Sequence, residues 1–323
     1  MSDAWPFVSV IIPTRPGQAE IPAVVSARQL DYPKDRLEIL VARGRQPAVQ
    51  RNAALRAARG DLVYFLDDDA CARPNNLGRA LAHFKDPRVT LVGGPNVCPP
   101  GAPLLERVFA VVLSSWLAFG PSRARYTPVG AVRDSSEKEL ILCNLAARRD
   151  AVLALGGFDE ALYPNEENAL MDALQTRGAR LLYDPDFLVH RRPRPTLAAF
   201  WRMLMTYGRG RAEQFRLHPT MGSALNFAPP LFCLYLLAAA VTAPWLGLIV
   251  ALPLAVYALA VLGQTLASMR QGFVLSLLAA PLLVASHLGY GLGFWRGLGT
   301  RLKPGADRPS TEVTVETEGP FAA

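Results

Sequence analysis

The chain has 323 residues, of which 51% are hydrophobic and 19% charged, and it carries a formal net charge of +7. An average globular chain is about 25% charged, and the deficit here lies between residues 225 and 295, where Arg270 is the sole formal charge. This composition excludes a disordered chain, a coiled coil, a disulfide-rich mini-protein and a wholly soluble enzyme. It predicts a soluble domain with a substantial core, followed by a membrane module.

The N-terminal part of the chain alternates between two patterns. Apolar, β-branched runs predict strands at residues 7–12, 37–42, 62–66 and 89–92. Helices are predicted between them, at residues 21–30, 47–59 and 74–84. Strands that alternate with helices form βαβ units, so the sequence predicts an α/β fold with a doubly wound, mostly parallel sheet.

The alternation loosens after residue 93. Helices are expected at residues 102–119, 149–155 and 166–177, the first with a partly exposed apolar face. Short strands are expected at residues 129–133, 141–146, 180–183 and 187–190.

Three apolar segments follow, at residues 225–242, 245–267 and 273–295. The first two are predicted to be membrane spans joined by a tight hairpin at Ala243-Pro244. The third segment, with 23 residues, is also long enough to cross. Its crossing would place Arg296, Arg301, Lys303 and Arg308 outside, against the positive-inside tendency. Length favours crossing, so the C-terminus is predicted to lie outside.

These elements predict four parts of the chain. Residues 1–195 are expected to form a catalytic α/β domain, and residues 196–224 a basic interfacial helix and linker. Residues 225–295 are expected to form two to three transmembrane helices. Residues 296–323 are expected to be a polar, disordered tail.

Basic charge is concentrated just ahead of the apolar region, where residues 177–216 contain nine Arg and three acidic residues. A juxtamembrane basic block usually faces the anionic cytoplasmic leaflet, and no recognition motif points to nucleic acid. Residues 1–7 do not resemble a signal peptide, and the four Cys form no disulfide or zinc pattern. The expected location is the cytoplasmic (inner) membrane, multi-pass, with the soluble domain in the cytosol.

An acidic triplet, Asp67-Asp68-Asp69, directly follows the predicted strand at residues 62–66. Ligands of open α/β sheets bind outside the carboxyl ends of the strands. Three adjacent carboxylates repel one another unless a cation lies among them, and hard oxygen ligands suit Mg²⁺ or Mn²⁺, which in turn would hold a diphosphate. A solvated acidic turn is the alternative, but the position after a buried strand favours the metal site.

Several motifs together resemble the inverting family 2 glycosyltransferases, in particular a membrane-anchored subgroup related to exopolysaccharide and lipid-linked glycan glycosyltransferases. They are the opening run VSVIIPT at residues 8–14, the segment RNAALRAARGD at 51–61, the acidic triplet, the block at 143–160 with GGFDE, and Glu166-Glu167. The resemblance implies a GT-A (Rossmann-like) fold, a D-x-D metal motif with Mg²⁺ or Mn²⁺, and a nucleotide-sugar donor.

The resemblance also implies roles for single residues. Metal ligands are expected at Asp69, Asp67 and His190. Glu167 is expected to be the general base, with Glu166 as the runner-up, although an ionised phosphate acceptor would need no base. Donor contacts are expected at Pro13, Thr14, Arg43, Gln50, Arg51, Asn52, Asp67 and Asp68.

One motif departs from the family. An Asp often stands at the end of the second strand and helps to hold the nucleotide base, but this chain has Ala42-Arg43-Gly44. Farther along, Arg guanidinium groups suit phosphate oxygens. Donor or acceptor phosphate contacts are therefore expected at Arg191, Arg192, Arg209 and Arg211.

The sequence thus predicts a membrane-anchored, inverting, metal-dependent glycosyltransferase. Its acceptor would be a polyprenyl phosphate, a lipid-linked glycan or a growing polysaccharide, and its partners the lipid bilayer and other glycan-assembly proteins. A degenerate GT-A scaffold or export partner without activity is the alternative. A tethered transferase with a soluble acceptor is the third interpretation.

Overall fold

The structure is a computed structural model that describes residues 5–160, 162, 165–217, 219, 224, 226–301 and 312–319. The chain forms two compact units, each discontinuous in sequence. The α/β unit comprises Met1–Pro99, Ala124–Arg192 and Lys303–Ala323, and the helical unit comprises Pro100–Arg123 and Pro193–Leu302. Residues 100–123 and 303–323 therefore group differently from the predicted four-part division.

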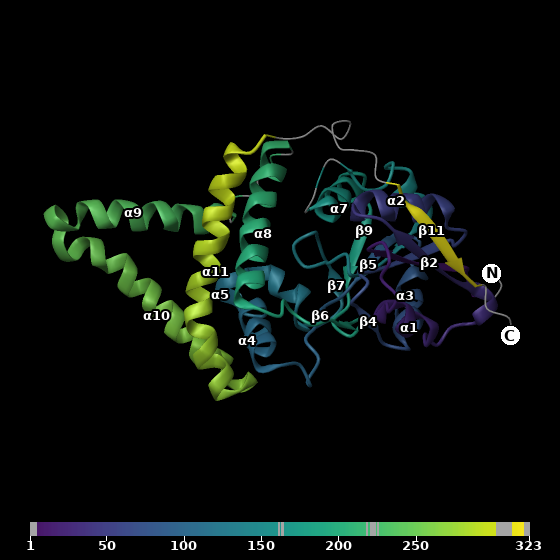
Figure 1. Cartoon of the computed structure of the whole chain (residues 1–323), viewed down its shortest axis with the longest axis horizontal. Coiled ribbons are helices and arrows are strands. Elements are labelled where there is room, and N and C mark those ends of the chain that lie inside the picture. The colour runs from purple at the N-terminus through teal and green to yellow at the C-terminus, as the bar shows by residue number, and fades with distance from the viewer. Residues whose placement is uncertain are drawn as a thin grey trace. The chain divides into compact units, whose positions relative to one another are not determined.

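An eight-stranded sheet forms the centre of the α/β unit, in the order β11-β2-β1-β3-β8-β5-β9-β7 (Figure 1). Its strands are β1 (Val8–Thr14), β2 (Leu37–Arg43), β3 (Leu62–Leu66), β5 (Val89–Gly93), β7 (Arg133–Asp134), β8 (Asn144–Arg148), β9 (Arg180–Tyr183) and β11 (Thr314–Glu318). The predicted α/β class is confirmed.

The sheet is mixed rather than mostly parallel. β1 runs parallel to β2 and β3, and β5 runs parallel to β9, but β8 is antiparallel to both β3 and β5. The register explains the direction of β8. Its first residue, Asn144, lies opposite Leu66 at the end of β3, so the chain re-enters the sheet at the edge where β3 leaves it.

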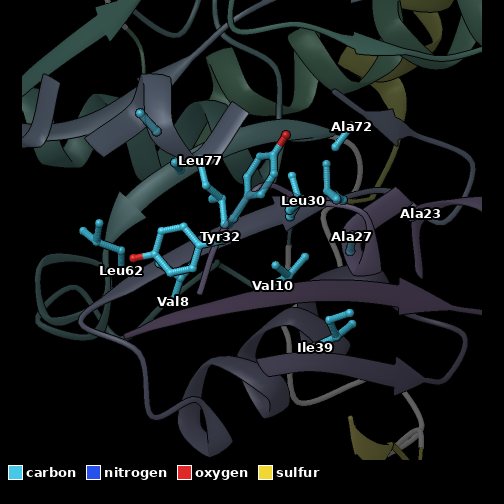
Figure 2. Close-up of a cluster of buried hydrophobic side chains, with 14 of the residues drawn as sticks. Val8, Val10, Ala23, Ala27, Leu30, Tyr32, Ile39, Leu62, Ala72 and Leu77 are labelled. Carbon is cyan, nitrogen blue, oxygen red and sulfur yellow. The ribbon is translucent and has the colours of Figure 1, made fainter. Parts of the chain in front are cut away.

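Helices cover both faces of the sheet. They are α1 (Pro22–Arg28), α2 (Pro47–Ala57), α3 (Asn76–Phe84), α6 (Arg149–Leu153) and α7 (Glu166–Thr176). Figure 2 shows one core cluster, in which Val8 and Val10 of β1 lie with Leu77 of α3. Ile11 belongs to the other cluster, with Leu55 of α2. Because alternate residues of β1 meet different helices, the whole strand is buried, which is why its sequence is apolar apart from Ser9 and Thr14.

A smaller sheet of two-residue strands lies beside the main one in the α/β unit. It comprises β4 (Cys71–Ala72), β10 (Val189–His190) and β6 (Asn96–Val97), in the order β4-β10-β6. β10 pairs antiparallel with β4 and parallel with β6. This sheet brings the segment after residue 189 next to the segment that follows the acidic triplet.

Strand β11 corrects the prediction of a disordered tail. Residues 314–318 pair antiparallel with β2, from Thr314 opposite Arg43 to Glu318 opposite Ile39. Val313 and Val315 pack against the second core cluster, which supplies the apolar contacts that a free tail would lack.

The helical unit contains α4 (Leu104–Leu113), α5 (Trp116–Phe119), α8 (Leu197–Leu217), α9 (Ala228–Leu246), α10 (Ala251–Ser268) and α11 (Phe273–Gly299). α4 belongs to it because its apolar face packs on other helices; Phe109, for example, stacks on Phe200 of α8 with ring centroids 4.2 Å apart. In the described part of the chain, two stretches are long and apolar enough to cross a membrane, Ala228–Gln271 and Phe273–Gly299. The bent pair Leu104–Leu113 and Trp116–Arg125 would be a third if it were one span.

The turn of the apolar hairpin lies later than predicted. Pro244 is inside α9, and the chain turns at a short 3₁₀ segment, Gly247–Val250. Gly247 has a φ of +56°, a conformation that glycine adopts without strain. The prediction of a turn at Ala243-Pro244 is therefore wrong.

Candidate active site

The acidic triplet lies at the carboxyl edge of the main sheet, immediately after β3. Two guanidinium groups contact it. Arg51 of α2 places Nη2 2.6 Å from Oδ1 of Asp67, and Arg191 places Nη1 2.9 Å from Oδ2 of the same carboxylate. Arg191 also places Nε 2.7 Å from Oδ1 of Asp69. Asp67 and Asp69 therefore converge on one cationic group.

Mutual repulsion is visible at the middle residue of the triplet. Burial, followed by the neighbouring charges of Asp69 and Asp67, raises the pKa of the Asp68 carboxyl. Arg191 and a hydrogen bond from Gln18 oppose the shift. The triplet is thus an electrostatically strained anionic cluster that added positive charge would stabilise.

The carboxylates of the triplet fit a divalent cation. Asp67 and Asp69 both lie within ion-pair distance of the Arg191 guanidinium, so their oxygens face a common charge. Mg²⁺ is usually bound through one or two carboxylates together with substrate phosphates, and two hard oxygen donors meet that requirement.

His190 does not join these carboxylates. No group of three or more His, Cys, Asp and Glu that could hold a metal is found among the residues that the structure describes. Nδ1 of His190 is buried without a hydrogen-bond partner in this part of the chain. Burial lowers the pKa of the imidazole, and Arg73 adds to the effect, so His190 is neutral at neutral pH. The next residue, Arg191, is the one that reaches the triplet.

Arg51 links the triplet to the acidic pair at the start of α7. Its Nη1 lies 3.2 Å from Oε1 of Glu166, and its side chain is only 5% exposed. Burial, together with the adjacent Glu167 carboxylate, raises the pKa of Glu166 to about 7, although Arg51 opposes the shift. One buried guanidinium therefore joins Asp67 and Glu166, which are far apart in sequence.

Glu167 has a different neighbour. Its Oε1 lies 4.0 Å from Nη1 of Arg125, which also donates to Oδ1 of Asn168 through Nη2 at 2.6 Å. Before α7, Asn165 has a φ of +93°, and it is the one non-glycine residue with positive φ in the described part of the chain. Such strain is often found at functional sites, and here it sets the direction in which α7 and its acidic pair begin.

Asn52 positions a loop. Its Oδ1 accepts from the backbone N–H of Phe158, and its Nδ2 donates to the Phe158 carbonyl at 2.9 Å and to Glu160 Oε1 at 2.8 Å. Gly157 has a φ of +86°, and a Cβ there would lie 2.3 Å from Asn52 Oδ1. The loop at residues 156–160 is thereby held against α2. Asn52, which was predicted to contact the donor, uses its side chain to position this loop.

The predicted donor contacts near β1 and β2 lie together at the edge of the sheet. Gln50 Nε2 donates to the carbonyls of Thr14 and Ala42, at 2.8 and 2.5 Å, and so bridges the ends of the two strands. Pro13 lies in β1 opposite Ala42. Arg43 donates to the Gln18 carbonyl and pairs with Glu316 of β11, 2.7 Å from its Oε1.

The predicted phosphate-binding arginines divide between the two units. Arg191 and Arg192 belong to the α/β unit. Arg209 and Arg211 lie on α8 in the helical unit, where Arg209 pairs with Glu213 at 3.5 Å and Arg211 donates to Gln214 at 3.1 Å.

Sequence reasoning missed Gln18, Arg125 and Glu316. None lies in a motif, and their contacts to Asp68, Glu167 and Arg43 join distant parts of the chain. Residue spacing and residue type, on which the sequence predictions rest, carry no signal for such pairs.

Comparison with known proteins finds a family whose members are similar to part of this chain. Residues 27–109 match the profile described as Glycosyl transferase family 2. This part of the chain is similar to the glycosyl transferase family 2 proteins. The matched region contains α2, β3 and the acidic triplet, which are the parts that carry Arg51, Asp67 and Asp69.

Two relatives of known description are similar in sequence. The pre-mycofactocin glycosyltransferase of Mycobacterium tuberculosis is 35% identical over 175 residues, which cover 54% of this chain and 36% of the relative. This chain thus matches little more than a third of that protein's length. The succinoglycan biosynthesis protein ExoA of Rhizobium meliloti is 29% identical over 263 residues, covering 78% of this chain and 74% of ExoA.

A solved structure confirms the predicted GT-A-like α/β fold. The mannosyltransferase PcManGT from Pyrobaculum calidifontis superimposes with a TM-score of 0.58 and 22% identity, over 88% of this chain and 86% of its own. That structure contains GDP-Man and Mn²⁺.

Proposed function

We propose that this chain is an inverting, metal-dependent glycosyltransferase that moves a sugar from a nucleotide-sugar donor to a membrane-associated acceptor. The observation that carries the proposal is the link through Arg51, which contacts Asp67 of the triplet at 2.6 Å and Glu166 of the acidic pair at 3.2 Å. Carboxylates that could hold a metal and an acidic pair in which the pKa of Glu166 is raised then belong to one cluster, as transfer from a diphosphate requires.

The donor half of the site is assigned to the triplet. Asp69 and Asp67 would hold Mg²⁺ or Mn²⁺, which when bound neutralises charge on the departing nucleoside diphosphate. The binding of Mn²⁺ and GDP-Man by PcManGT supports this assignment. Arg191 contacts both carboxylates, and its guanidinium can bind phosphate oxygens in the same bidentate manner.

The acceptor half is assigned to Glu167 as the general base. Its side chain is 15% exposed, against 6% for Glu166, and its 4.0 Å separation from Arg125 is longer than the Glu166–Arg51 contact. Glu166 is the second candidate, because a pKa of about 7 suits a base that works near neutral pH. Its ion pair with Arg51 favours a positioning role instead.

The acceptor is assigned to the membrane. The apolar stretches Ala228–Gln271 and Phe273–Gly299 support attachment to a bilayer, and the name of ExoA connects a relative with polysaccharide biosynthesis. A polyprenyl phosphate, a lipid-linked glycan or a growing polysaccharide fits this setting. We place the α/β unit on the cytosolic face of the cytoplasmic membrane, where the basic segment 177–216 would face anionic lipid.

A scaffold without activity is the competing function, favoured by Arg43 at the position where the family often has an Asp. The test incubates membranes containing the chain with labelled nucleotide sugars and extracts them with organic solvent. Label in the organic phase is expected, and Asp69→Asn should abolish it while Asp31→Asn, at an exposed site, should not. Label in polymer that sediments with the membranes would indicate a growing polysaccharide as the acceptor. Label confined to soluble glycan would indicate a tethered transferase with a soluble acceptor, and no transfer with any donor would support the scaffold.

A further inference from the structure

The last described strand returns the chain to the α/β unit. β11 forms five register pairs with β2, and two ion pairs reinforce them. Arg28 binds Glu318 through two hydrogen bonds of 2.9 and 2.8 Å, and Arg43 binds Glu316 at 2.7 Å. Residues 314–318 therefore belong to the same folded body as β1, β2 and β3.

This pairing constrains the path of the helical unit through a bilayer. A folded α/β body with polar edges lies wholly on one side of a membrane, because unpaired backbone groups are not tolerated in hydrocarbon. Strand β10, which ends at His190, and strand β11, which begins at Thr314, are both parts of that body. The segment between them must cross the membrane an even number of times.

The α9–α10 hairpin has the properties of a membrane-inserted element. Its arms have 19 and 18 residues, or about 28 and 27 Å, close to the hydrocarbon thickness of about 30 Å. In Figure 1, α9 runs out and α10 runs back. No residue in the most apolar stretch of the hairpin is buried within the protein.

The turn of the hairpin is apolar as well. Trp245 is 77% exposed, Leu248 89% and Ile249 75%. Soluble proteins rarely expose a continuous apolar surface of this kind, and the hairpin contains no charged residue before Arg270. We infer that the acyl chains of a bilayer cover this surface. A hairpin that enters the bilayer and returns contributes an even number of crossings.

α11 is as long as a span but has a polar helix as its neighbour. It packs on α8 through Gly289, Gly293 and Gly297, where Cβ atoms would lie 3.2 Å from Leu204 and Trp201 side chains, 2.2 Å from the Met205 carbonyl and 2.5 Å from the Arg209 carbonyl. At Gly293 and Gly297 the nearest atoms belong to the backbone of α8, so the two helices are in direct backbone contact there.

α8 cannot lie in hydrocarbon, because it carries four Arg and one Glu. One of them, Arg216, donates Nη1 to the carbonyls of Gly297 and Thr300, at 3.1 and 2.6 Å, and so caps the C-terminal end of α11. The glycine-rich half of α11 is therefore held at the depth of α8. The burial of its most apolar stretch agrees, since 39% of that stretch lies inside the protein, against 0% for the most apolar stretch of the hairpin.

We propose that the α9–α10 hairpin is the sole membrane-inserted element of the described chain, that α11 lies along α8 without crossing, and that β11 is on the same side as β1–β3. This inference goes beyond the proposed function and replaces the expectation of an external C-terminus. It also places Arg296 and Arg301 on the same side as the basic segment 177–216, as the positive-inside rule prefers.

Cysteine labelling tests the proposal without any need for activity. Single cysteines are introduced at Glu312, just before β11, and at Ala82, an exposed position on α3, in a chain whose four native Cys are replaced by Ser. Sealed membrane vesicles of known orientation are treated with a membrane-impermeant maleimide before and after detergent. The two sites should label from the same side. Labelling from opposite sides would overturn the proposal.

A deletion distinguishes the hairpin from α11. The full chain should remain in the membrane pellet after alkaline carbonate extraction, whereas a variant in which a Gly-Ser linker replaces residues 228–271 should be extracted. Retention of the deletion variant, with its Glu312→Cys site on the opposite side from Ala82→Cys, would show that α11 spans. Both readouts are independent of sugar transfer, so loss of the proposed function would leave this inference standing.

Discussion

The α/β unit and the helical unit distribute charge and apolar surface in opposite ways. In the α/β unit, Arg51 and Glu166 are each 4% exposed and bind one another. In the helical unit, the large apolar side chain of Leu248 is 89% exposed. The first pattern suits a site in which buried charges need partners, and the second suits a hydrocarbon solvent. The contrast is what the proposed function requires of one chain, a polar donor site in one unit and an apolar membrane anchor in the other.

The largest effect is expected when the buried charge link is broken. Arg51→Met leaves Asp67 and Glu166 without their shared cation and should lower the free energy of unfolding by about 3–5 kcal/mol. Arg56→Met, at an exposed position on the same helix, should change it by less than about 0.5 kcal/mol. Urea unfolding in detergent measures the free energy of unfolding of both variants. Equal changes in the two would mean that the ion pairs of Arg51 do not stabilise the site.

Catalysis should depend next on the acidic pair. Glu167→Gln should reduce the transfer rate by about 10²-fold or more, as expected for loss of a general base, with donor binding little changed. Steady-state kinetics with the labelled donor provide the comparison. A larger loss of kcat in Glu166→Gln would transfer the role of base to Glu166.

A lysine introduced on the apolar surface of the helical unit should lower membrane retention, whereas a lysine introduced on the α/β unit should not. Leu259, in the middle of α10, is 67% exposed, and Leu259→Lys should cost about 2.5–3.5 kcal/mol if this position lies in hydrocarbon. Membrane fractionation should show a fall in the retained protein. Ala82→Lys on α3 is the matched control, and equal retention of both variants would argue that α10 is outside the bilayer.

The raised pKa of Glu166 predicts a pH dependence of stability. The fold favours the neutral carboxyl, whose pKa rises from 4.5 to about 7. The stabilisation is therefore fully present below the unfolded-state pKa and is lost as the pH rises through 7. Unfolding measured from pH 5 to 8 should show the wild-type protein losing stability relative to Glu166→Gln. A constant difference across this range would mean that Glu166 is charged throughout.

The smallest effect is expected at the edge of the sheet. The Arg28–Glu318 pair has side chains that are 54% and 33% exposed, so Glu318→Gln should lower stability by less than about 1 kcal/mol. Val315→Asp should cost more, because Val315 packs against the core. If both variants had the same small effect on thermal unfolding, β11 would not be part of the folded sheet.

Elements with continuous apolar sequence were predictable because burial on both faces dictates their composition. β1 and β3 begin or end within two residues of the expected positions, and β9 coincides with its predicted range. β4, β6 and β10 have two residues each and depend on pairing between distant segments. β11 has the polar sequence TVETE, and the open edge of β2, rather than its own composition, makes it a strand.

The candidate site was predictable in its parts but not in its connections. The triplet and Glu166-Glu167 were found because charge at the end of a buried strand or the start of a helix is conspicuous. Arg51 and Arg191 were expected to contact the donor or a phosphate, but their ion pairs with acidic side chains could not be predicted, because Arg51, for example, reaches Glu166 across 115 positions of sequence. Ion pairs between distant segments follow from the tertiary fold, and residue spacing carries no record of them.

Metal-dependent binding of a nucleoside diphosphate tests the central claim most directly. Isothermal titration of the purified chain in detergent with UDP and with GDP, each with and without Mn²⁺, measures the donor site apart from any acceptor. The account predicts that at least one nucleotide binds only with Mn²⁺, and that Asp69→Asn abolishes this binding while Asp31→Asn preserves it. Binding of neither nucleotide, or Mn²⁺-dependent binding that survives Asp69→Asn, would contradict it.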